Sequence, residues 1–292
     1  SAMSASGTIW YNNKLMTESG VDTFPATWEE MKSVAETLRG AGQIPLMFGG
    51  KDNWQNYDMF LTIMATINKD LCNDIFALEG SWTEEDVVKA FDYYQKLFTD
   101  GIVQDGALST TIYNEGYSQW KDDDGNSTIP MIFNGSWDMG SLKAENSFYE
   151  NFSSNDIRVG LMPSIEGKEG AVLTAPDVAW GVNANSANKE AAWEFVKWLC
   201  YDMQQDVVDG LGFFSVLKDA PSPTVELTAD YQAAYDVISA AAASEHTVGF
   251  RSSFYTELND ALFDQLQLLG TGAATPEEAA AAMEEAAAGI AK

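Results

Sequence analysis

The sequence predicts an α/β protein in which short strands alternate with longer amphipathic helices. Apolar runs of strand length, such as residues 8–11 and 44–48, are followed by segments whose apolar residues have helical spacing. The chain has 292 residues and 46% of them are apolar, so a sizeable core can be buried in one large domain or two modest ones. No apolar run approaches the roughly 18 residues that a membrane-spanning helix needs.

Capping residues mark the first long helix. Thr27 is followed three positions later by Glu30, a capping box in which the threonine oxygen accepts a backbone amide and the glutamate reaches back to the cap. We expect this helix to end at Gly40, because glycine favours helix termination. The next strand, residues 44–48, contains Pro45, which indicates an edge strand or the start of a strand.

The same kinds of signal place the later elements. Thr83 is followed by three acidic residues, which suit the positive end of a helix dipole, and predicts a helix that ends at Gly101. Further strands are predicted at residues 129–133, 157–162 and 178–182. From about Asn188 onward the pattern is almost entirely helical, and the last helix begins at Thr275, a cap followed by proline.

The charge balance narrows the choice of partners. The chain carries 44 acidic and 16 basic side chains, a formal net charge of −28. A surface this negative repels phosphate backbones and anionic lipids, so we expect neither nucleic acid nor a membrane surface as a partner. Anionic small molecules are disfavoured as ligands for the same reason.

Few residues are available for catalysis or for binding a metal or a cofactor. His246 is the only histidine, and the G-x-S-x-G and phosphate-loop motifs are absent, so neither a nucleophilic triad nor a nucleotide site is expected. Cys72 and Cys200 lack metal-ligand spacing and are interpreted as thiols. One enzymatic hypothesis stays open, a glycoside-active enzyme with paired carboxylates, because folding can bring together any two of the 44 acidic residues.

Aromatic residues in polar surroundings suggest a binding site. Trp54 and Tyr57 lie among turn residues and amides, and Trp137 directly follows a predicted strand. Tyr255 follows a short run that contains arginine and two serines. Sugars present apolar C–H faces ringed by hydroxyls, and aromatic faces combined with amides and carboxylates bind both features. These residues permit a carbohydrate site, although each of them also suits packing in the core.

Several segments form a recognisable set. Residues 10–30 contain a tyrosine-asparagine-lysine strand end, a short helix, a glycine, a proline and a Thr-Trp-Glu-Glu cap. Three more segments follow at residues 44–48, 130–137 and 185–195. In order and spacing, the set resembles the family 1 extracellular solute-binding proteins of ABC importers. No single segment decides the match, but together they are specific and cover nearly the whole chain.

This resemblance implies a periplasmic-binding-protein-like fold of type II, an α/β architecture in which two lobes close on a ligand by hinge bending. It divides the chain into a C-terminal lobe, helices of a truncated N-terminal lobe and a tag remnant, which are residues 4–182 with 231–292, residues 183–230 and residues 1–3. The chain would then begin well inside the family's protein. We expect the helices of the incomplete lobe to expose apolar side chains such as Phe213 and Phe214, or to bury them by rearrangement or self-association.

The resemblance also implies a function. The protein would be an exported receptor, lipid-anchored to the cell membrane or periplasmic, that captures a sugar or oligosaccharide and delivers it to ABC permease subunits. It implies no catalytic residue, no metal and no cofactor. By position, the four aromatic residues named above match places where the family stacks rings on sugars, whereas Gln55 stands where a relative has an aromatic residue.

The expected ligand-binding residues follow from these positions and from the place where the chain leaves the lobe. They are Asp52, Trp54, Gln55, Tyr57, Trp137, Asp177, Trp180 and Tyr255. Two alternatives stay open beside the sugar receptor. One is the glycoside-active enzyme with paired carboxylates, and the other is a receptor for a different small solute, such as a polyamine or a phosphate ester.

Overall fold

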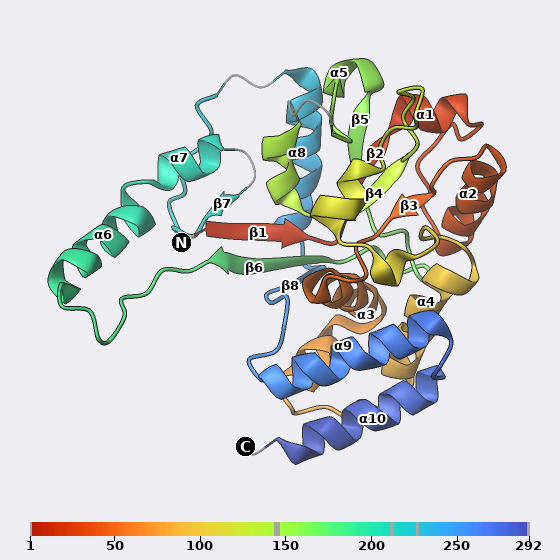
Figure 1. Cartoon of the computed structure of the whole chain (residues 1–292). Coiled ribbons are helices and arrows are strands. Elements are labelled where there is room, and N and C mark those ends of the chain that lie inside the picture. The colour runs from red at the N-terminus through yellow and green to blue at the C-terminus, as the bar shows by residue number, and fades with distance from the viewer. Residues whose placement is uncertain (1, 143–146, 211–212, 226–227, 291–292) are drawn as a thin grey trace.

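Two four-stranded sheets organise the protein, whose computed structural model describes residues 2–142, 147–210, 213–225 and 228–290 (Figure 1). The first sheet has the order β7-β1-β6-β8 and the second has the order β3-β4-β2-β5. The strands of the first sheet are β1 (Ala2–Ser6), β6 (Val172–Val178), β7 (Phe214–Ser215) and β8 (Thr247–Val248). Those of the second are β2 (Thr8–Asn12), β3 (Leu46–Met47), β4 (Met131–Asn134) and β5 (Ile157–Leu161).

The second sheet is buried on both faces, because side chains of a strand alternate between its two sides. Ile9 and Phe133 belong to one core, which includes side chains of α2 (Trp28–Gly40), α3 (Asn53–Phe76) and α4 (Glu85–Thr99). Trp10 and Ile132, the neighbouring residues on the same strands, belong to a second core with α8 (Ala229–Ala242). The predicted α/β layering is confirmed, and β3, which contains the segment after Pro45, lies at a sheet edge as expected.

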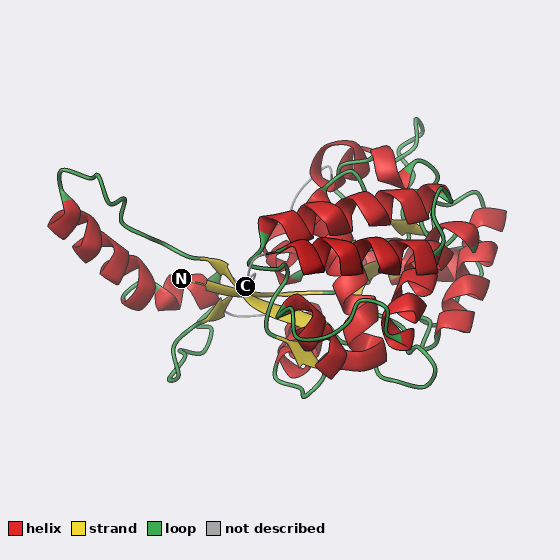
Figure 2. Cartoon of the chain, turned by 90° about the horizontal axis from the view of Figure 1, so that it is seen from below, coloured by secondary structure: helices red, strands yellow, loops and turns green. Residues whose placement is uncertain are grey.

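A layer of helices packs around the core that contains Ile9 and Phe133. It consists of α3, α4, α9 (Thr256–Thr271) and α10 (Pro276–Gly289), and Figure 2 shows α9 and α10 lying side by side. The capping boxes at Thr27 and Thr275 are both present. Thr83, however, is not the cap of α4: the helix begins at Glu85 and Glu84 is its N-cap residue. The shorter helices are α1 (Asn13–Glu18) and α5 (Phe152–Asn155).

Two antiparallel strands, β1 and β6, lead from the main body to an arm that consists of α6 (Lys189–Tyr201), α7 (Gln204–Asp209) and β7 (Figure 1). We call β1 and β6 the connecting strands. The strand predicted at residues 178–182 lies earlier in the chain, since β6 ends at Val178. Within the described residues, no helix has the length and apolar character needed to span a membrane.

The arm coincides with most of the segment assigned to helices of the N-terminal lobe. α6 and α7 lie within residues 189–209 and β7 is formed by residues 214–215, whereas α8 begins at Ala229 and packs against β5 of the main body. Ala2 and Met3, interpreted from sequence as part of a tag remnant, lie in β1 and pair with β6 and β7. Ser1 lies outside the described residues.

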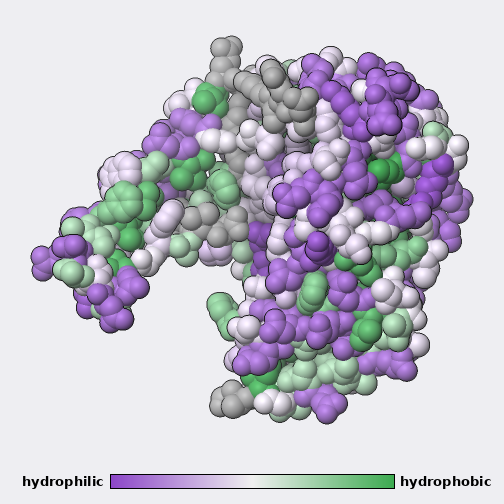
Figure 3. Space-filling model, in the orientation of Figure 1, coloured by the Kyte–Doolittle hydropathy of each residue, from purple (hydrophilic) through white to green (hydrophobic). Residues whose placement is uncertain are grey.

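Apolar side chains are exposed on the arm, but not the ones that were expected. Phe213 and Phe214 are half-buried. The exposed apolar residues lie on α6, where each of the following is between 46% and 64% exposed: Trp193, Phe195, Trp198 and Tyr201. Figure 3 shows hydrophobic patches along this arm. Self-association of the chain stays a prediction.

The junction between β1 and β2 requires glycine. Gly7 has a φ of +89°, which side-chain-bearing residues rarely adopt, and a β-carbon there would lie 2.6 Å from Thr62 Oγ1 of α3. The absence of a side chain therefore allows α3 to pack directly against the point where the two sheets meet.

We predict that Gly7→Ala lowers the free energy of unfolding by about 3 kcal/mol, the sum of a left-handed backbone penalty and a steric clash. Gly42→Ala is the matched control, because Gly42 has a φ of +80° but no atom within 4 Å of the added carbon. It should lose only about 1 kcal/mol. Urea unfolding measures both values, and equal losses would contradict a packing role for Gly7.

Candidate functional site

A pocket of about 770 Å³ lies where three parts of the main body meet. Its walls come from the first turns of α3, from residues 249–252 and Phe254 of the loop between β8 and α9 together with the first turns of α9, and from two residues of the connecting strand β6, Ala175 and Pro176. Tyr113 and Trp137 complete the lining on the side of the second sheet. Figure 3 shows that the molecular surface is hollowed between the arm and α9.

An aromatic cluster forms one wall of this pocket. The rings of Trp54 and Tyr113 stack with 6.0 Å between their centroids and an angle of 20° between their planes. Trp137 meets Trp54 edge-on, with centroids 5.7 Å apart. Tyr57 lies on the same helix as Trp54 and also lines the pocket. Aromatic faces of this kind bind apolar ligand surfaces.

A glycine brings Tyr113 to Trp54, although 59 positions of sequence separate the two residues. Tyr113 lies in a short π-helix, Ile112–Gly116, of a type often found at functional sites. A β-carbon on Gly49 would lie 2.7 Å from the backbone nitrogen of Ile112, so only glycine permits this approach. Asp52 strengthens it, because its Oδ2 accepts a hydrogen bond from the Ile112 amide at 2.8 Å.

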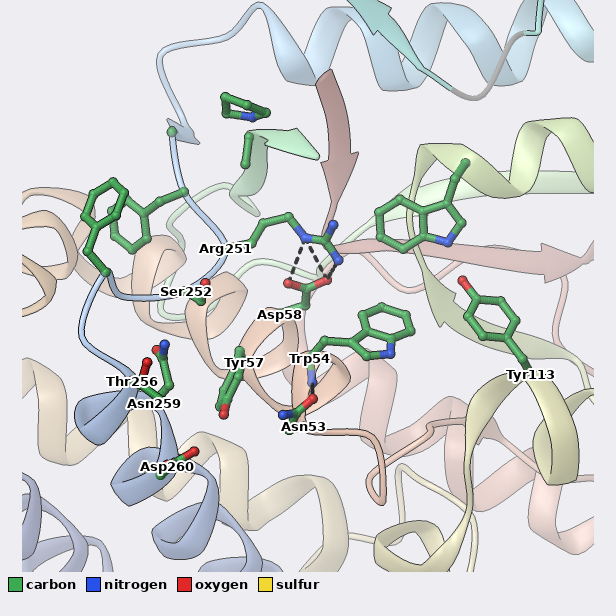
Figure 4. A pocket seen from close by; sticks show the side chains of 16 residues that line it. Asn53, Trp54, Tyr57, Asp58, Tyr113, Arg251, Ser252, Thr256, Asn259 and Asp260 are labelled. Atoms are coloured by element: carbon green, nitrogen blue, oxygen red, sulfur yellow. Dashed lines mark hydrogen bonds and ion pairs between the residues drawn. The ribbon is translucent and has the colours of Figure 1, made fainter. Parts of the chain in front are cut away.

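An ion pair lies at the centre of the pocket (Figure 4). Arg251 Nη2 lies 2.6 Å from Asp58 Oδ2, and Arg251 Nε lies 3.1 Å from Asp58 Oδ1. The Asp58 side chain is 1% exposed and the Arg251 side chain 17%. Arg251 Cζ also lies 4.5 Å from the centroid of Trp137, within the range of a cation–π contact. The two-point geometry is that of a guanidinium fork on a carboxylate.

Uncharged polar groups and one exposed acid form the wall on the α9 side. Asn259 and Asp260 project from the first turns of α9, near Ser252 and Thr256 (Figure 4). Asn259 also fixes the loop before the helix: its Oδ1 accepts from the Ser253 amide at 2.8 Å and its Nδ2 donates to the Ser253 carbonyl at 2.9 Å. The pocket therefore combines aromatic faces with hydrogen-bonding groups of both kinds.

A buried carboxyl group supports the aromatic wall from behind. Asp138 follows Trp137 and is 2% exposed. Its Oδ2 accepts hydrogen bonds from Tyr117 Oη at 2.6 Å, from Asn134 Nδ2 at 2.6 Å and from the Tyr149 hydroxyl. Burial raises the pKa of Asp138 to about 6, while these hydrogen bonds oppose that rise.

Three of the predicted ligand-binding residues meet in the pocket, namely Trp54, Tyr57 and Trp137. Gln55 does not: it is buried, its Oε1 accepts from the Gly49 amide and its Nε2 donates to the Phe133 carbonyl. Consecutive residues of a helix point in directions about 100° apart, so Gln55 cannot share the orientation of Trp54. Asp52 is outside the lining as well and holds the Ile112 segment instead.

The structure places two of the three remaining predicted residues, Tyr255 and Trp180, outside the lining of the pocket. Tyr255 is half-buried against the core, whereas its neighbour Phe254 lines the pocket and is 99% exposed. Trp180 follows β6, is 52% exposed and does not line the pocket. Asp177 belongs to β6, and its side chain lies outside the described residues.

Sequence reasoning missed most of the other lining residues, among them Asp58, Tyr113, Arg251 and Phe254. Arg251 and Phe254 carried a local signal, because a charged and an aromatic side chain lie close together in a polar segment, and loops often carry binding residues. Asp58 carried a weaker signal, a single charge in the otherwise apolar stretch of residues 57–67. Nothing in the local pattern pointed to Tyr113.

The ion pair makes Asp58 unsuited to acid catalysis. A glycosidase acid must hold a proton to donate, whereas Asp58 is engaged by a guanidinium and by the hydroxyl of Ser6. His246, the single histidine, pairs with Glu169 and does not line the pocket. Among the residues that the structure describes, no group of acidic, histidine or cysteine side chains has an arrangement that could hold a metal ion.

The sequence model of the family described as bacterial extracellular solute-binding protein matches residues 2–205. The chain belongs to this family. A comparison with curated protein sequences gave no match. The solute-binding fold predicted from sequence, periplasmic-binding-protein-like, is therefore confirmed by both the family match and the architecture.

Solved structures with the same fold cover nearly all of the chain. A chitin oligosaccharide binding protein has a TM-score of 0.78 at 20% identity, with 99% of this chain and 71% of that one covered. Maltose-bound MalE3 of T. maritima has a TM-score of 0.70 at 18% identity, with 98% and 71% covered. The solute-binding protein RafE in complex with raffinose has a TM-score of 0.64 at 17% identity, with 97% and 70% covered.

We predict a distinctive pH dependence from Asp138. Because burial raises the pKa of Asp138 from the ordinary aspartate value of about 3.9 to about 6, its stabilising contribution is fully present below about pH 4 and is lost as the pH rises through 6. Relative to Asp138→Asn, the wild type should therefore lose about 3 kcal/mol of unfolding free energy as the pH rises from 3.5 to 7.5. Urea unfolding across this range measures it.

Asp122→Asn is the control for this measurement. Hydrogen bonds from Asn126 lower the pKa of Asp122, so its contribution is lost as the pH falls and the sign of its effect is opposite. A wild type and an Asp138→Asn variant with parallel pH profiles would show that Asp138 keeps an ordinary pKa.

Proposed function

We propose that this member of the solute-binding family captures a neutral sugar or oligosaccharide in the pocket beside Arg251. The observation that carries the proposal is the combination of aromatic faces from Trp54, Tyr57 and Trp137 with amide and hydroxyl groups on the opposite wall. Such a combination matches the two kinds of surface that a sugar presents. The charge of Arg251 is balanced by Asp58, so the pocket favours an uncharged ligand.

Three proteins with the same fold support this class of ligand. They bind a chitin oligosaccharide, maltose and raffinose, which are all uncharged sugars of two or more units. The polyamine alternative fits the pocket less well, because a cage for an amine needs several carboxylates free to face it, and Asp58 is already paired. The enzymatic alternative needs a pair of carboxyl groups of which one holds a proton, and Asp58, one of the carboxylates that line the pocket, is already engaged by Arg251.

We further propose that the ligand is delivered to ABC permease subunits outside the cell membrane, from a receptor that is lipid-anchored or periplasmic. The connecting strands β1 and β6 suit the hinge motion that this role requires, because they join the pocket-bearing body to the arm. Capture would proceed without bond cleavage, and the arm side would close over the bound sugar.

The first test is calorimetric titration of the chain with a panel of maltose, raffinose and chitin oligosaccharides, followed by analysis of the sugars recovered. We expect saturable binding with the sugar unchanged, and at least about tenfold weaker binding by Trp137→Ala, because a stacked ring is a typical affinity hot spot. Cleaved sugar would support the enzymatic alternative. If no sugar of the panel binds and a polyamine does, the sugar assignment is wrong.

We also propose that Phe254, rather than Tyr255, supplies the aromatic platform at the start of α9. The Phe254 ring is 99% exposed and lines the pocket, whereas Tyr255 packs partly against the core. Because it is exposed beside the pocket, the whole Phe254 ring is available to stack on a ligand.

The adjacent pair provides its own control. Phe254→Ala should weaken binding about tenfold while leaving the melting temperature unchanged, because its ring makes little contact with the fold. Tyr255→Ala should lower the melting temperature and change the affinity less. Titration calorimetry and thermal unfolding of the two variants measure these effects, and the reverse pattern would restore Tyr255 as the ligand-binding residue.

A further inference from the structure

The ion pair in the pocket is connected to the strand that leads to the arm. Ser6, the last residue of β1, donates a hydrogen bond from its Oγ to Asp58 Oδ2 at 2.6 Å. Ser6 and Asp58 are both buried, and the same carboxylate oxygen lies 2.6 Å from Arg251 Nη2. One buried carboxylate thus joins the connecting strand to the loop before α9.

Arg251 extends this connection to the aromatic wall. Its guanidinium lies over the ring of Trp137, with 4.5 Å from Cζ to the centroid, and 5.7 Å from the centroid of Trp54. Asp58 fixes the plane of the guanidinium, because contacts through both Nε and Nη2 leave little freedom of rotation. The position of Asp58 therefore determines how Arg251 meets Trp137.

A second contact reaches the same wall from the neighbouring residue of β1. The Ala5 amide donates to Ser136 Oγ at 3.0 Å, and Ser136 directly precedes Trp137. The last two residues of β1 consequently touch both sides of the pocket, through Ser136 on the sheet side and through Asp58 on the α3 side. A shift of β1 would therefore displace groups in both walls of the pocket.

We propose that Asp58 is a positioning residue that ties the connecting strand β1 to the ligand-facing groups Arg251 and Trp137. The carboxylate holds Ser6 on one side and the guanidinium on the other, and the guanidinium determines the face that Trp137 presents. The shape of the pocket and the conformation of the strand that leads to the arm are then coupled. A hinge motion of the arm would therefore change the positions of the groups that face the ligand. The role in ligand capture rests on the proposed function, whereas the coupling itself does not.

The decisive experiment uses the ligand-free chain, three single variants and two measurements. Near-ultraviolet circular dichroism reports the surroundings of Trp137, and hydrogen exchange of residues 2–6 reports the stability of β1. Ser6→Ala should speed exchange in β1 at least about tenfold and leave the dichroism unchanged. Arg251→Gln should change the dichroism and leave exchange in β1 near the wild-type rate. Asp58→Asn should change both.

Two controls make the result specific. The dichroism change caused by Asp58→Asn should vanish when it is measured in a Trp137→Phe background, which shows that the signal comes from that ring. Asp260→Asn removes a carboxylate from the same pocket without touching the ion pair, and it should alter neither measurement. If Asp58→Asn fails to fold because it removes the charge that balances Arg251, the double variant Asp58→Asn/Arg251→Gln removes both charges and should still change both measurements.

Two outcomes would overturn the proposal. One is exchange in β1 at the wild-type rate in both Ser6→Ala and Asp58→Asn, and the other is a dichroism change that persists without Trp137. With a sugar that saturates the wild type, Asp58→Asn should bind at least about tenfold more weakly, and Ser6→Ala should lose the ligand-induced slowing of exchange in β1. A wild type that binds no sugar refutes the proposed function, while the ligand-free measurements still decide the role of Asp58.

Discussion

The packing of α3 against the junction of the two sheets is the constraint on which the rest of this structure depends. Three residues at successive turns of the helix make this contact. Asp58 accepts a hydrogen bond from Ser6, Thr62 occupies the space left by the missing side chain of Gly7, and Thr66 Oγ1 accepts from the Ala171 amide at 2.9 Å. Their spacing of four residues places them on one face of the helix, which lies against the ends of both connecting strands.

This arrangement explains why the pocket is located at the start of α3. The body of the helix is held in the core, so its first turns project from a rigid support toward the loop before α9. Binding residues on a rigid element keep their geometry with little loss of conformational entropy when a ligand arrives. The buried carboxyl group of Asp138 gives Trp137 comparable support from the opposite wall, through three hydrogen-bond donors.

The arm and the main body differ in how they use apolar residues. Apolar side chains of the main body fill two cores on either side of the second sheet, whereas α6 presents several aromatic rings to solvent. Phe195 and Trp198 stack on one another there, with centroids 5.8 Å apart. The chain spans about 71% of the length of the chitin oligosaccharide binding protein whose fold it shares. Charge and apolar exposure act in opposite directions on this arm, because a net charge of −28 opposes the association that exposed rings favour.

The sequence by itself determined the local elements and the family. Capping boxes at Thr27 and Thr275 depend on residues three positions apart, so they can be predicted without knowledge of the fold, and the strands around Ile9 and Ile132 follow from short-range apolar runs. Trp54 and Trp137 were identifiable because large aromatic residues are conspicuous in polar segments.

The tertiary structure alone decided which side chains meet. Asp58 and Arg251 are 193 positions apart, and their pairing depends on how α3 and the loop before α9 pack, for which no local pattern exists. Tyr113 reaches Trp54 through a close contact between Gly49 and Ile112, and the choice between Phe254 and Tyr255 depends on the direction in which each side chain leaves the helix start. Orientation is a property of the packed chain, because a one-residue change of position on a helix turns a side chain by about 100°.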